Sequence, residues 1–193
     1  MNTLQSHGTF PSVLYKVFNK KIYAEDFING KIRFANIYYY RNIEDNIRQD
    51  MSEGTGRIMY NGTARQSSFA NNSTFIFCCH KSLESALESP FGNIIVEIKN
   101  PKEVADQISL YLSKHKDKYF GGIEGIEIKY NYSHNMDKNP SSLEMATFTY
   151  SQKPHTFDKE DEFRFVFIKE NTDEQFITIN VNLTHNTSII AKK

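Results

Sequence analysis

Residues 73–80, STFIFCCH, form a nearly continuous apolar run near the middle of the chain. A short apolar run without polar alternation is typical of a strand that is covered on both faces of a sheet. We therefore expect residues 73–80 to form a buried central strand, and the fold is interpreted outward from it.

Several other segments have strand or helix patterns. The strand candidates are residues 12–18, 31–40, 93–99, 122–132, 161–168 and 175–181, with the last two expected to pair as a hairpin. Helical spacing indicates helices that end at Gly30, over 82–89, and over 101–116 after Pro101 at a first turn. Residues 54–68 favour a loop or a weak hairpin around Tyr60-Asn61-Gly62. This pattern predicts one α+β domain over residues 1–193, with a central, largely antiparallel sheet, a few flanking helices and a flexible segment 1–11.

The composition excludes some classes of protein. Lys plus Arg and Asp plus Glu number 23 each, so the formal net charge is zero and bulk attraction to DNA or acidic membranes is not indicated. Neither a secretory signal nor an apolar run of about 20 residues is present, which argues against a membrane protein. The only cysteines, Cys78 and Cys79, are adjacent, and we interpret them as reduced thiols of a cytoplasmic protein.

A pair of glutamates opens the apolar strand near the C-terminus. In TFDKEDEFRFVF, Glu160 and Glu162 are two residues apart, so an extended strand would place both carboxylates on one face. Two close carboxylates can divide labour, one ionised and the other with a raised pKa. The alternative is a charged strand entrance in which Arg164 simply pairs with Glu162.

The order of these segments resembles the ADP-ribosyltransferase superfamily. The resemblance rests on VLYKVF, a helix ending at Gly30, KIRFANIYYYR, and the E-x-E near the C-terminus, and it covers about residues 12–60 and 145–182. Lys16 stands where the arginine-type branch has arginine, and Ser73 and Thr74 match half of that branch's Ser-Thr-Ser strand. The chain also resembles a group of uncharacterised bacterial proteins with an N-terminal L-Y-K-x-F and a C-terminal E-x-E-x-R.

The resemblance implies ADP-ribosyl transfer from NAD, with no metal, to a protein or nucleic-acid acceptor. Glu162 would stabilise the positive charge that develops on the ribose, and Glu160 would activate the nucleophile. The candidate NAD-binding residues are Tyr15, Lys16, Tyr40, Arg41, Asp45 and Arg48. A bacterial toxin or anti-phage effector, with an antitoxin as a possible partner, is the setting that the resemblance suggests.

The charged stretch RNIEDNIRQDMSEG, residues 41–54, leaves two interpretations open. Arg41 with Asp45 and Glu44 with Arg48 have the i,i+4 spacing of a salt-bridged surface helix. The preceding Tyr38-Tyr39-Tyr40 instead puts the stretch next to buried surface, where a site is commonly built.

Two other functions compete with the transferase. Asp117, Glu127 and Lys129 resemble the D…E-x-K core of restriction-type nucleases, although VEIK at 96–99 repeats the E-x-K pattern. A non-catalytic binding module, in which the charged clusters are structural, is the third. Cys78, Cys79 and His80 have no metal-ligand spacing, and no phosphate-loop motif occurs in the chain.

Overall fold

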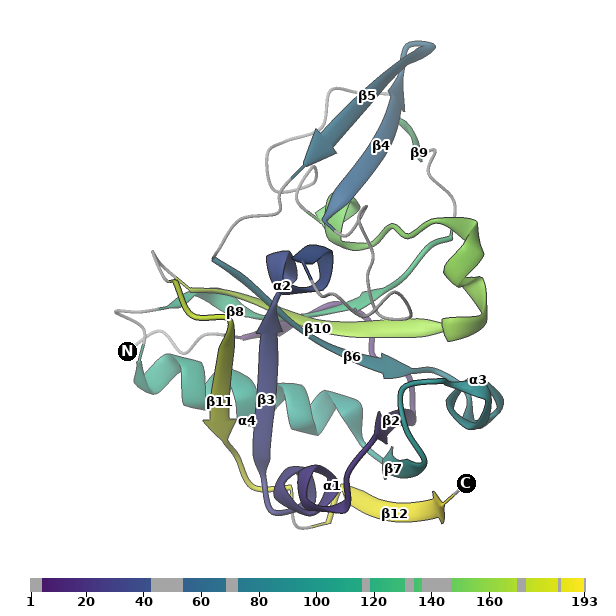
Figure 1. Cartoon of the computed structure of the whole chain (residues 1–193). Helices are drawn as coiled ribbons and strands as arrows, with labels where there is room; N and C mark the ends of the chain where they lie inside the picture. The colour runs from purple at the N-terminus through teal and green to yellow at the C-terminus, as the bar shows by residue number, and fades with distance from the viewer. Residues whose placement is uncertain are drawn as a thin grey trace.

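The computed structural model describes residues 5–42, 54–68, 73–115, 119–130, 134–136, 147–169, 173–183 and 185–192. It is an α+β fold with a mixed, mostly antiparallel open sheet (Figure 1). The main sheet contains β1 (Ser6–His7), β2 (Leu14–Phe18), β3 (Lys31–Asn36), β6 (Thr74–His80), β7 (Ile94–Ile98), β8 (Tyr119–Glu127), β10 (Glu162–Lys169), β11 (Phe176–Asn180) and β12 (Thr187–Lys192). A smaller sheet contains β4 (Thr55–Tyr60), β5 (Thr63–Ser68) and β9 (His134–Met136). The labelled helices are α1 (Lys21–Ile28), α2 (Ile37–Asn42), α3 (Leu83–Glu88), α4 (Pro101–Lys114) and the 3-10 helix η1 (His155–Glu160), and residues 147–150 are helical as well.

The central strand is β6, as its apolar sequence predicts. It pairs antiparallel with β10 along its whole length, from Glu162 opposite His80 to Ile168 opposite Thr74. β10 alternates between two environments, because successive strand residues face opposite sides of a sheet. Its three phenylalanines at 163, 165 and 167 lie in the main core, whereas Glu162 and Arg164 lie on the other face.

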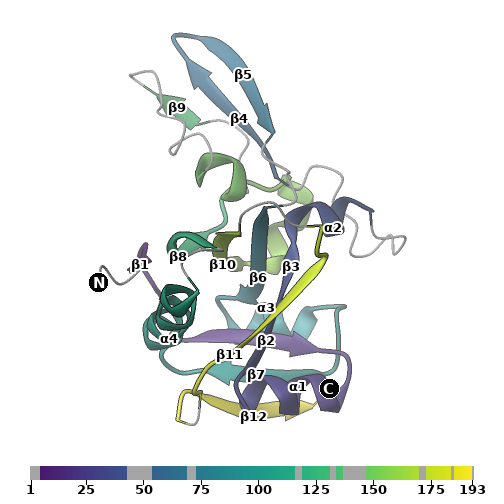
Figure 2. The same ribbon diagram turned by 90° about the vertical axis from the view of Figure 1, so that its left-hand side faces the viewer.

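The other edge of β6 is shared by two strands, so the sheet forks there. β2 pairs with β6 only at Tyr15 opposite His80, and β3 pairs with it at Ala35 and Asn36, opposite Ile76 and Phe75. Residues 77–79 of β6 lie between these two pairings. Figure 2 shows the result, with β2 and β7 running across the direction of β3 and β6. The opening between β2 and β3 is where the pocket described below forms.

The helices that carry the clearest sequence signals form as predicted. α4 begins with Asn100, whose side chain accepts from the Glu103 amide, and it has Pro101 in its first turn. α1 ends before Gly30, which has a φ of 89°. A Cβ added to Gly30 would lie 1.9 Å from the Val181 carbonyl oxygen, so both the backbone angle and the close packing require glycine.

The segment 54–68, for which the sequence favoured a loop or a weak hairpin, also forms regular structure. β4 and β5 make the hairpin that was one of two alternatives, turning at Asn61 and Gly62, which both have positive φ. The hairpin projects from the body of the protein in Figure 1. None of the described helices is long and apolar enough to cross a membrane.

Three expectations about elements need correction. The strand expected over 31–40 ends at Asn36, because the Asn36 side-chain oxygen accepts from the Tyr38 amide (2.8 Å) and starts the helix α2. β10 and β11 do not form a hairpin, since β11 pairs with β3, where Thr178 lies opposite Arg33. β12 is a further strand, paired with β7, that the sequence did not indicate.

Part of the N-terminal segment that was expected to be flexible takes part in the fold. Ser6 and His7 pair in parallel with Ile123 and Glu124 of β8. Phe10 then packs against the core, with its ring centroid 5.7 Å from that of Phe163. The aromatic side chain anchors this end of the chain to the sheet.

Candidate functional site

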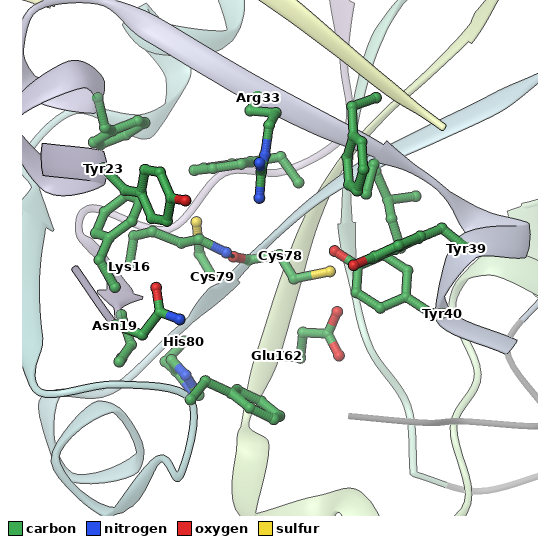
Figure 3. A pocket seen from close by; sticks show the side chains of 18 of the residues that line it. Lys16, Asn19, Tyr23, Arg33, Tyr39, Tyr40, Cys78, Cys79, His80 and Glu162 are labelled. Carbon is green, nitrogen blue, oxygen red and sulfur yellow. Dashed lines mark hydrogen bonds between the residues drawn. The ribbon is translucent and has the colours of Figure 1, made fainter. Parts of the chain in front are cut away.

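A pocket of about 600 Å³ occupies the fork between β2 and β3 (Figure 3). The open stretch of β6, residues 77–79, forms its floor together with the adjoining His80. Lys16 enters from β2, Arg33 from β3, and Tyr39 and Tyr40 from α2. The segment that leads through η1 into β10 supplies four more lining residues, Lys153, Phe157, Glu160 and Glu162. The pocket therefore collects cationic, aromatic and acidic side chains from segments distant in the sequence.

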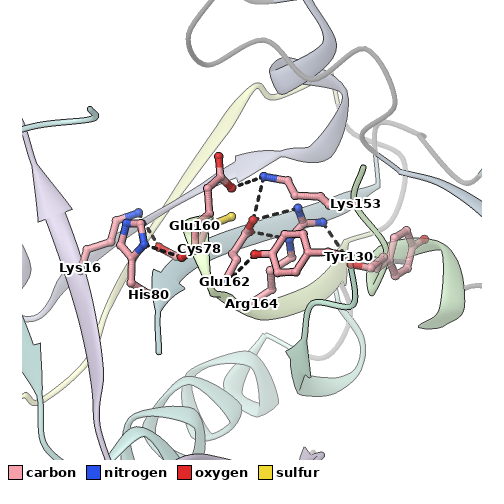
Figure 4. A network of polar contacts seen from close by, with 9 residues as sticks. Lys16, Cys78, His80, Tyr130, Lys153, Glu160, Glu162 and Arg164 are labelled. Carbon is pink, nitrogen blue, oxygen red and sulfur yellow. Dashed lines mark hydrogen bonds and ion pairs between the residues drawn. The ribbon is translucent and has the colours of Figure 1, made fainter. Parts of the chain in front are cut away.

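Glu162 is a buried carboxylate held by two cations. Its side chain accepts from Arg164 through Nε on Oε1 (2.6 Å) and Nη2 on Oε2 (3.3 Å), and Lys153 Nζ lies 2.8 Å from Oε2 (Figure 4). Glu162 is 3% exposed and Arg164 is fully buried. Burial alone would raise the pKa of Glu162, but the charges of Arg164 and Lys153 hold this pKa well below its ordinary value. Glu162 is therefore a permanent anion at neutral pH.

The backbone around Glu162 is held in place as well. The Glu162 amide donates to the Tyr130 hydroxyl (2.7 Å), and Arg164 Nη1 donates to the Tyr150 carbonyl (3.1 Å). Cys78, opposite Arg164 in the β6–β10 ladder, contributes a side-chain hydrogen bond to Glu162. Burial, with the nearby charge of Glu162, raises the pKa of the Cys78 thiol well above its ordinary value. Cys78 is therefore a protonated donor and not a nucleophilic thiolate.

Glu160 differs from Glu162 in its protonation. It faces the same pocket and receives Lys153 Nζ on Oε2 (2.6 Å). Burial, and to a smaller degree the charge of Glu162, raise the pKa of Glu160 to about 7, against the attraction of Lys153. One carboxylate of the pair is thus fixed as an anion, and the other exchanges a proton near neutral pH. This is the division of labour that one interpretation of the E-x-E motif predicts.

His80 supports the segment that carries Glu160. Its Nδ1 lies 2.6 Å from the Glu160 carbonyl oxygen, which can only accept, so Nδ1 carries the proton. Burial lowers the pKa of His80, which keeps the ring neutral. The ring is thereby a fixed link between β6 and the end of η1.

Lys16 occupies the gap that the fork leaves on β6. Its Nζ donates to the Cys78 carbonyl oxygen (2.6 Å) and lies 4.6 Å from the centre of the Phe77 ring. The ammonium group thus satisfies a backbone acceptor that no strand in the described part of the chain reaches. An ammonium group has two more protons, which can serve an anion in the pocket.

The sequence-predicted residues divide into three groups. Glu160, Glu162, Lys16 and Tyr40 line the pocket together. Tyr15 does not line it, because Tyr15 precedes Lys16 on a strand and so faces the other side, where it packs in a cluster with Val17, Ala86 and Ile95. The Arg41 side chain and all of Asp45 and Arg48 lie outside the described residues.

The half-matched Ser-Thr motif has a structural place away from the pocket. Thr74 is fully buried, and its hydroxyl lies 3.0 Å from the Tyr150 hydroxyl. Neither Ser73 nor Thr74 is among the pocket residues. Thr74 therefore tethers the start of β6 to the segment before η1.

Sequence reasoning missed Lys153 and Arg33. Lys153 lies in the turn-rich SQKPHTF stretch, where nothing in the local pattern marks one lysine as buried. Arg33 is a polar residue in an alternating strand, which is the usual pattern of a half-exposed sheet. The only available signal for Arg33 was its shared face with Lys31 and Ala35, and all three line the pocket.

The nuclease residues are not gathered at this pocket. Glu127 is exposed and pairs with Lys81 at 2.6 Å, and neither Glu127 nor Lys129 lines the pocket. Asp117 lies outside the described residues. Within the described ranges, no group of three or more His, Cys, Asp or Glu side chains is placed to hold a metal ion.

The fold and the pocket define a class: an α+β protein with a buried and a half-buried carboxylate at one side of a cation- and aromatic-lined cavity. Comparison with family models, curated proteins and solved structures found no match to this chain.

Proposed function

We propose that this chain is an ADP-ribosyltransferase that cleaves the nicotinamide–ribose bond of NAD in the pocket of the forked sheet. The observation that carries the proposal is the carboxylate pair, in which Glu162 stays ionised and Glu160 has a pKa of about 7. Both face a cavity whose size lies in the range of small-molecule sites, about 300–1,000 Å³.

The chemistry needs a fixed negative charge and a proton acceptor. As the C–N bond breaks, its electron pair leaves with nicotinamide and positive charge builds on the ribose, which the Glu162 carboxylate stabilises. The acceptor's nucleophilic atom then bonds to the ribose carbon, and its proton passes to Glu160. A group with a pKa near 7 suits that second role, because it is ionised often enough to take the proton.

The ribose has a place at Glu162. A carboxylate has about four acceptor positions. At Glu162 the nitrogen donors of Arg164 and Lys153 take three of them, and the Cys78 thiol and the protonated form of Glu160 also hydrogen-bond to this carboxylate. A thiol is the weakest of these donors. A ribose hydroxyl therefore replaces the Cys78 thiol without breaking the ion pairs that keep Glu162 charged.

The remaining parts of NAD match other lining residues. Lys16 provides a cation for the diphosphate, next to the floor of the pocket. Tyr39 and Tyr40 present aromatic surface, with ring centroids 5.7 Å apart, for a nicotinamide or adenine ring. These roles correct the sequence-based set by removing Tyr15 and adding Lys153, which joins the two carboxylates.

The biological setting follows from the resemblance described above. We place the activity in the bacterial cytoplasm, in a toxin or anti-phage effector, with a protein or nucleic-acid acceptor and an antitoxin as partner. No membrane association enters this proposal.

The test is nicotinamide release from NAD by the wild type and by Glu162→Gln. The amide keeps the shape of the side chain and removes its charge, so the rate should fall by roughly 10²-fold or more, the scale of one lost electrostatic contact. Glu88→Gln, at an exposed position on α3, is the matched control and should keep the wild-type rate. A wild-type protein that releases no nicotinamide, with protein and nucleic-acid acceptors supplied, would falsify the proposal.

A further inference from the structure

One side of the pocket carries excess positive charge away from the glutamates. We call it the Arg33 side, and it consists of Lys20, Tyr23, Asp26, Lys31, Arg33, Phe176 and Thr178. Figure 3 shows Arg33 and Glu162 reaching into the pocket from different sides, with Lys16 and Cys78 between them in that view. These residues come from α1 and the preceding Lys20, from β3 and from β11. None of these elements supplies Glu160 or Glu162.

The charges on the Arg33 side do not cancel. Lys31 pairs with Asp26 at 2.8 Å, which uses the single carboxylate of this side. Lys20 and Arg33 are left, and neither lies within ion-pair distance of a carboxylate in the described part of the chain. Three cations against one anion leave two positive charges here, in a chain whose formal net charge is zero. A local excess of this kind favours an anionic ligand group.

Arg33 is held in a way that leaves its donors available. The centre of its guanidinium group lies 4.6 Å from the centre of the Phe176 ring and 5.6 Å from that of the Tyr23 ring. Thr178 lies opposite Arg33 in the β3–β11 ladder, so the strand pairing fixes Phe176 beside it. A guanidinium that stacks on rings keeps its N–H groups at its edge, where they match two oxygens of a phosphate.

We propose that the Arg33 side binds a phosphate group separate from the diphosphate, and that the preferred ligand is therefore the 2′-phosphorylated dinucleotide NADP. This inference rests on the proposed function, because it assumes that a dinucleotide lies with its nicotinamide end at Glu162 and its diphosphate at Lys16. The adenosine end then reaches the Arg33 side. NADP differs from NAD by a phosphate on the ribose of that adenosine, and this phosphate suits the excess of Lys20, Lys31 and Arg33 over Asp26 among the described residues of the Arg33 side.

Binding, measured by isothermal titration calorimetry at about 0.15 M salt, tests the inference without requiring turnover. The probes are NADP, NAD, adenosine 2′,5′-bisphosphate and adenosine 5′-monophosphate. Wild-type protein should bind each 2′-phosphorylated member about 10-fold or more tightly than its partner, since the added phosphate gains charge-assisted contacts to Arg33. Arg33→Met should remove this preference and leave the NAD affinity within about twofold. Lys99→Met, an exposed lysine outside the pocket, should change neither.

The outcomes separate this inference from the transferase proposal. Equal affinity of the wild type for both members of each pair, or no binding of any probe, overturns the phosphate site. An equal loss of NAD and NADP affinity in Arg33→Met also overturns it, because Arg33 would then serve the common part of the two ligands. A preference that depends on Arg33, in a protein that releases nicotinamide from neither dinucleotide, supports the phosphate site and contradicts the transferase.

Discussion

Lys153 is the residue whose replacement tests the electrostatics of the site most directly. It is 8% exposed, and its ammonium group lies 2.6 Å from Glu160 and 2.8 Å from Glu162. Lys153→Met removes the charge and keeps a similar length. Removing one partner of a buried ion pair usually costs about 3–5 kcal/mol, because the remaining charge is left uncompensated.

For Lys153→Met the loss of unfolding free energy should be smaller than this at pH 7 and should grow at higher pH. The pKa of Glu160 is already about 7, so at pH 7 this carboxyl can take a proton at almost no cost, while Glu162 keeps Arg164. The remaining cost at pH 7 is the loss of the hydrogen bonds that Lys153 makes to the two glutamates, about 1.5–3 kcal/mol of unfolding free energy. Without Lys153 the pKa of Glu160 rises further, so folded Lys153→Met protein keeps this proton above pH 7 whereas the unfolded chain does not.

The sign and size of the pH dependence follow from that proton. The folded variant binds one more proton than its unfolded chain, so its stability falls by about 1.4 kcal/mol for each pH unit above 7. The wild type has little such slope from Glu160, because there the group is ionised in both states above its pKa of about 7. Between pH 7 and pH 9 the difference between the two proteins should therefore grow by up to about 2.3 kcal/mol, because the wild type is half protonated at pH 7 and itself loses about 0.4 kcal/mol over this range.

Urea denaturation at pH 6, 7, 8 and 9 measures this difference. Lys159→Met, at an exposed lysine in the 3-10 helix η1 that ends at Glu160, is the control and should show a small difference that does not vary with pH. A Lys153→Met difference that stays constant from pH 7 to pH 9 would refute the assignment of Glu160 as the titrating group.

Three further changes test other parts of the structure. Glu160→Gln should lower kcat/KM by about 10²–10⁴-fold. In the wild type kcat/KM should rise through about pH 7 as Glu160 loses its proton, and the variant should lack this rise; nicotinamide release measured over a pH series checks both. Arg164→Met should reduce the free energy of unfolding by about 3–5 kcal/mol, because it strands the buried Glu162 charge with one cation, and a loss below about 1 kcal/mol in urea would count against that pairing. Gly30→Ala should cost at least about 1–3 kcal/mol by thermal or urea unfolding, since alanine would meet the Val181 carbonyl at a φ of 89°; wild-type stability would show that this turn can relax.

Much of the site's chemistry was readable because it lies within one short segment. Glu162 and Arg164 share a strand face, and their ion pair follows from the two-residue period of any strand. Phe163, Phe165 and Phe167 alternate with these charged residues and pack into the main core on the other face of the strand. Helix α4 was equally readable, since Pro101 in its first turn and its apolar spacing are signals within a few residues.

Other features depended on contacts between distant segments. Nothing near Lys153 in the sequence says that it will be buried between two carboxylates, because the interaction forms only when the segment before η1 packs over β6. Arg33 likewise gains its aromatic neighbours from α1 and β11, and the pairing of β11 with β3 replaced the hairpin that adjacency in the sequence suggested. Tyr15 and Lys16 were both assigned to the site, and the fold turned one of them away from it.

The sequence by itself determined the α+β class, the buried strand at 73–80 and the charge pairing at the start of β10, because hydrophobic period and strand geometry are local properties. Only the tertiary structure decided where the pocket lies. The fork arises because β2 and β3 share one edge of β6 at its two ends, and which strand pairs with which edge depends on how the whole core packs. The cavity and its charges are a product of that packing, and no single segment encodes them.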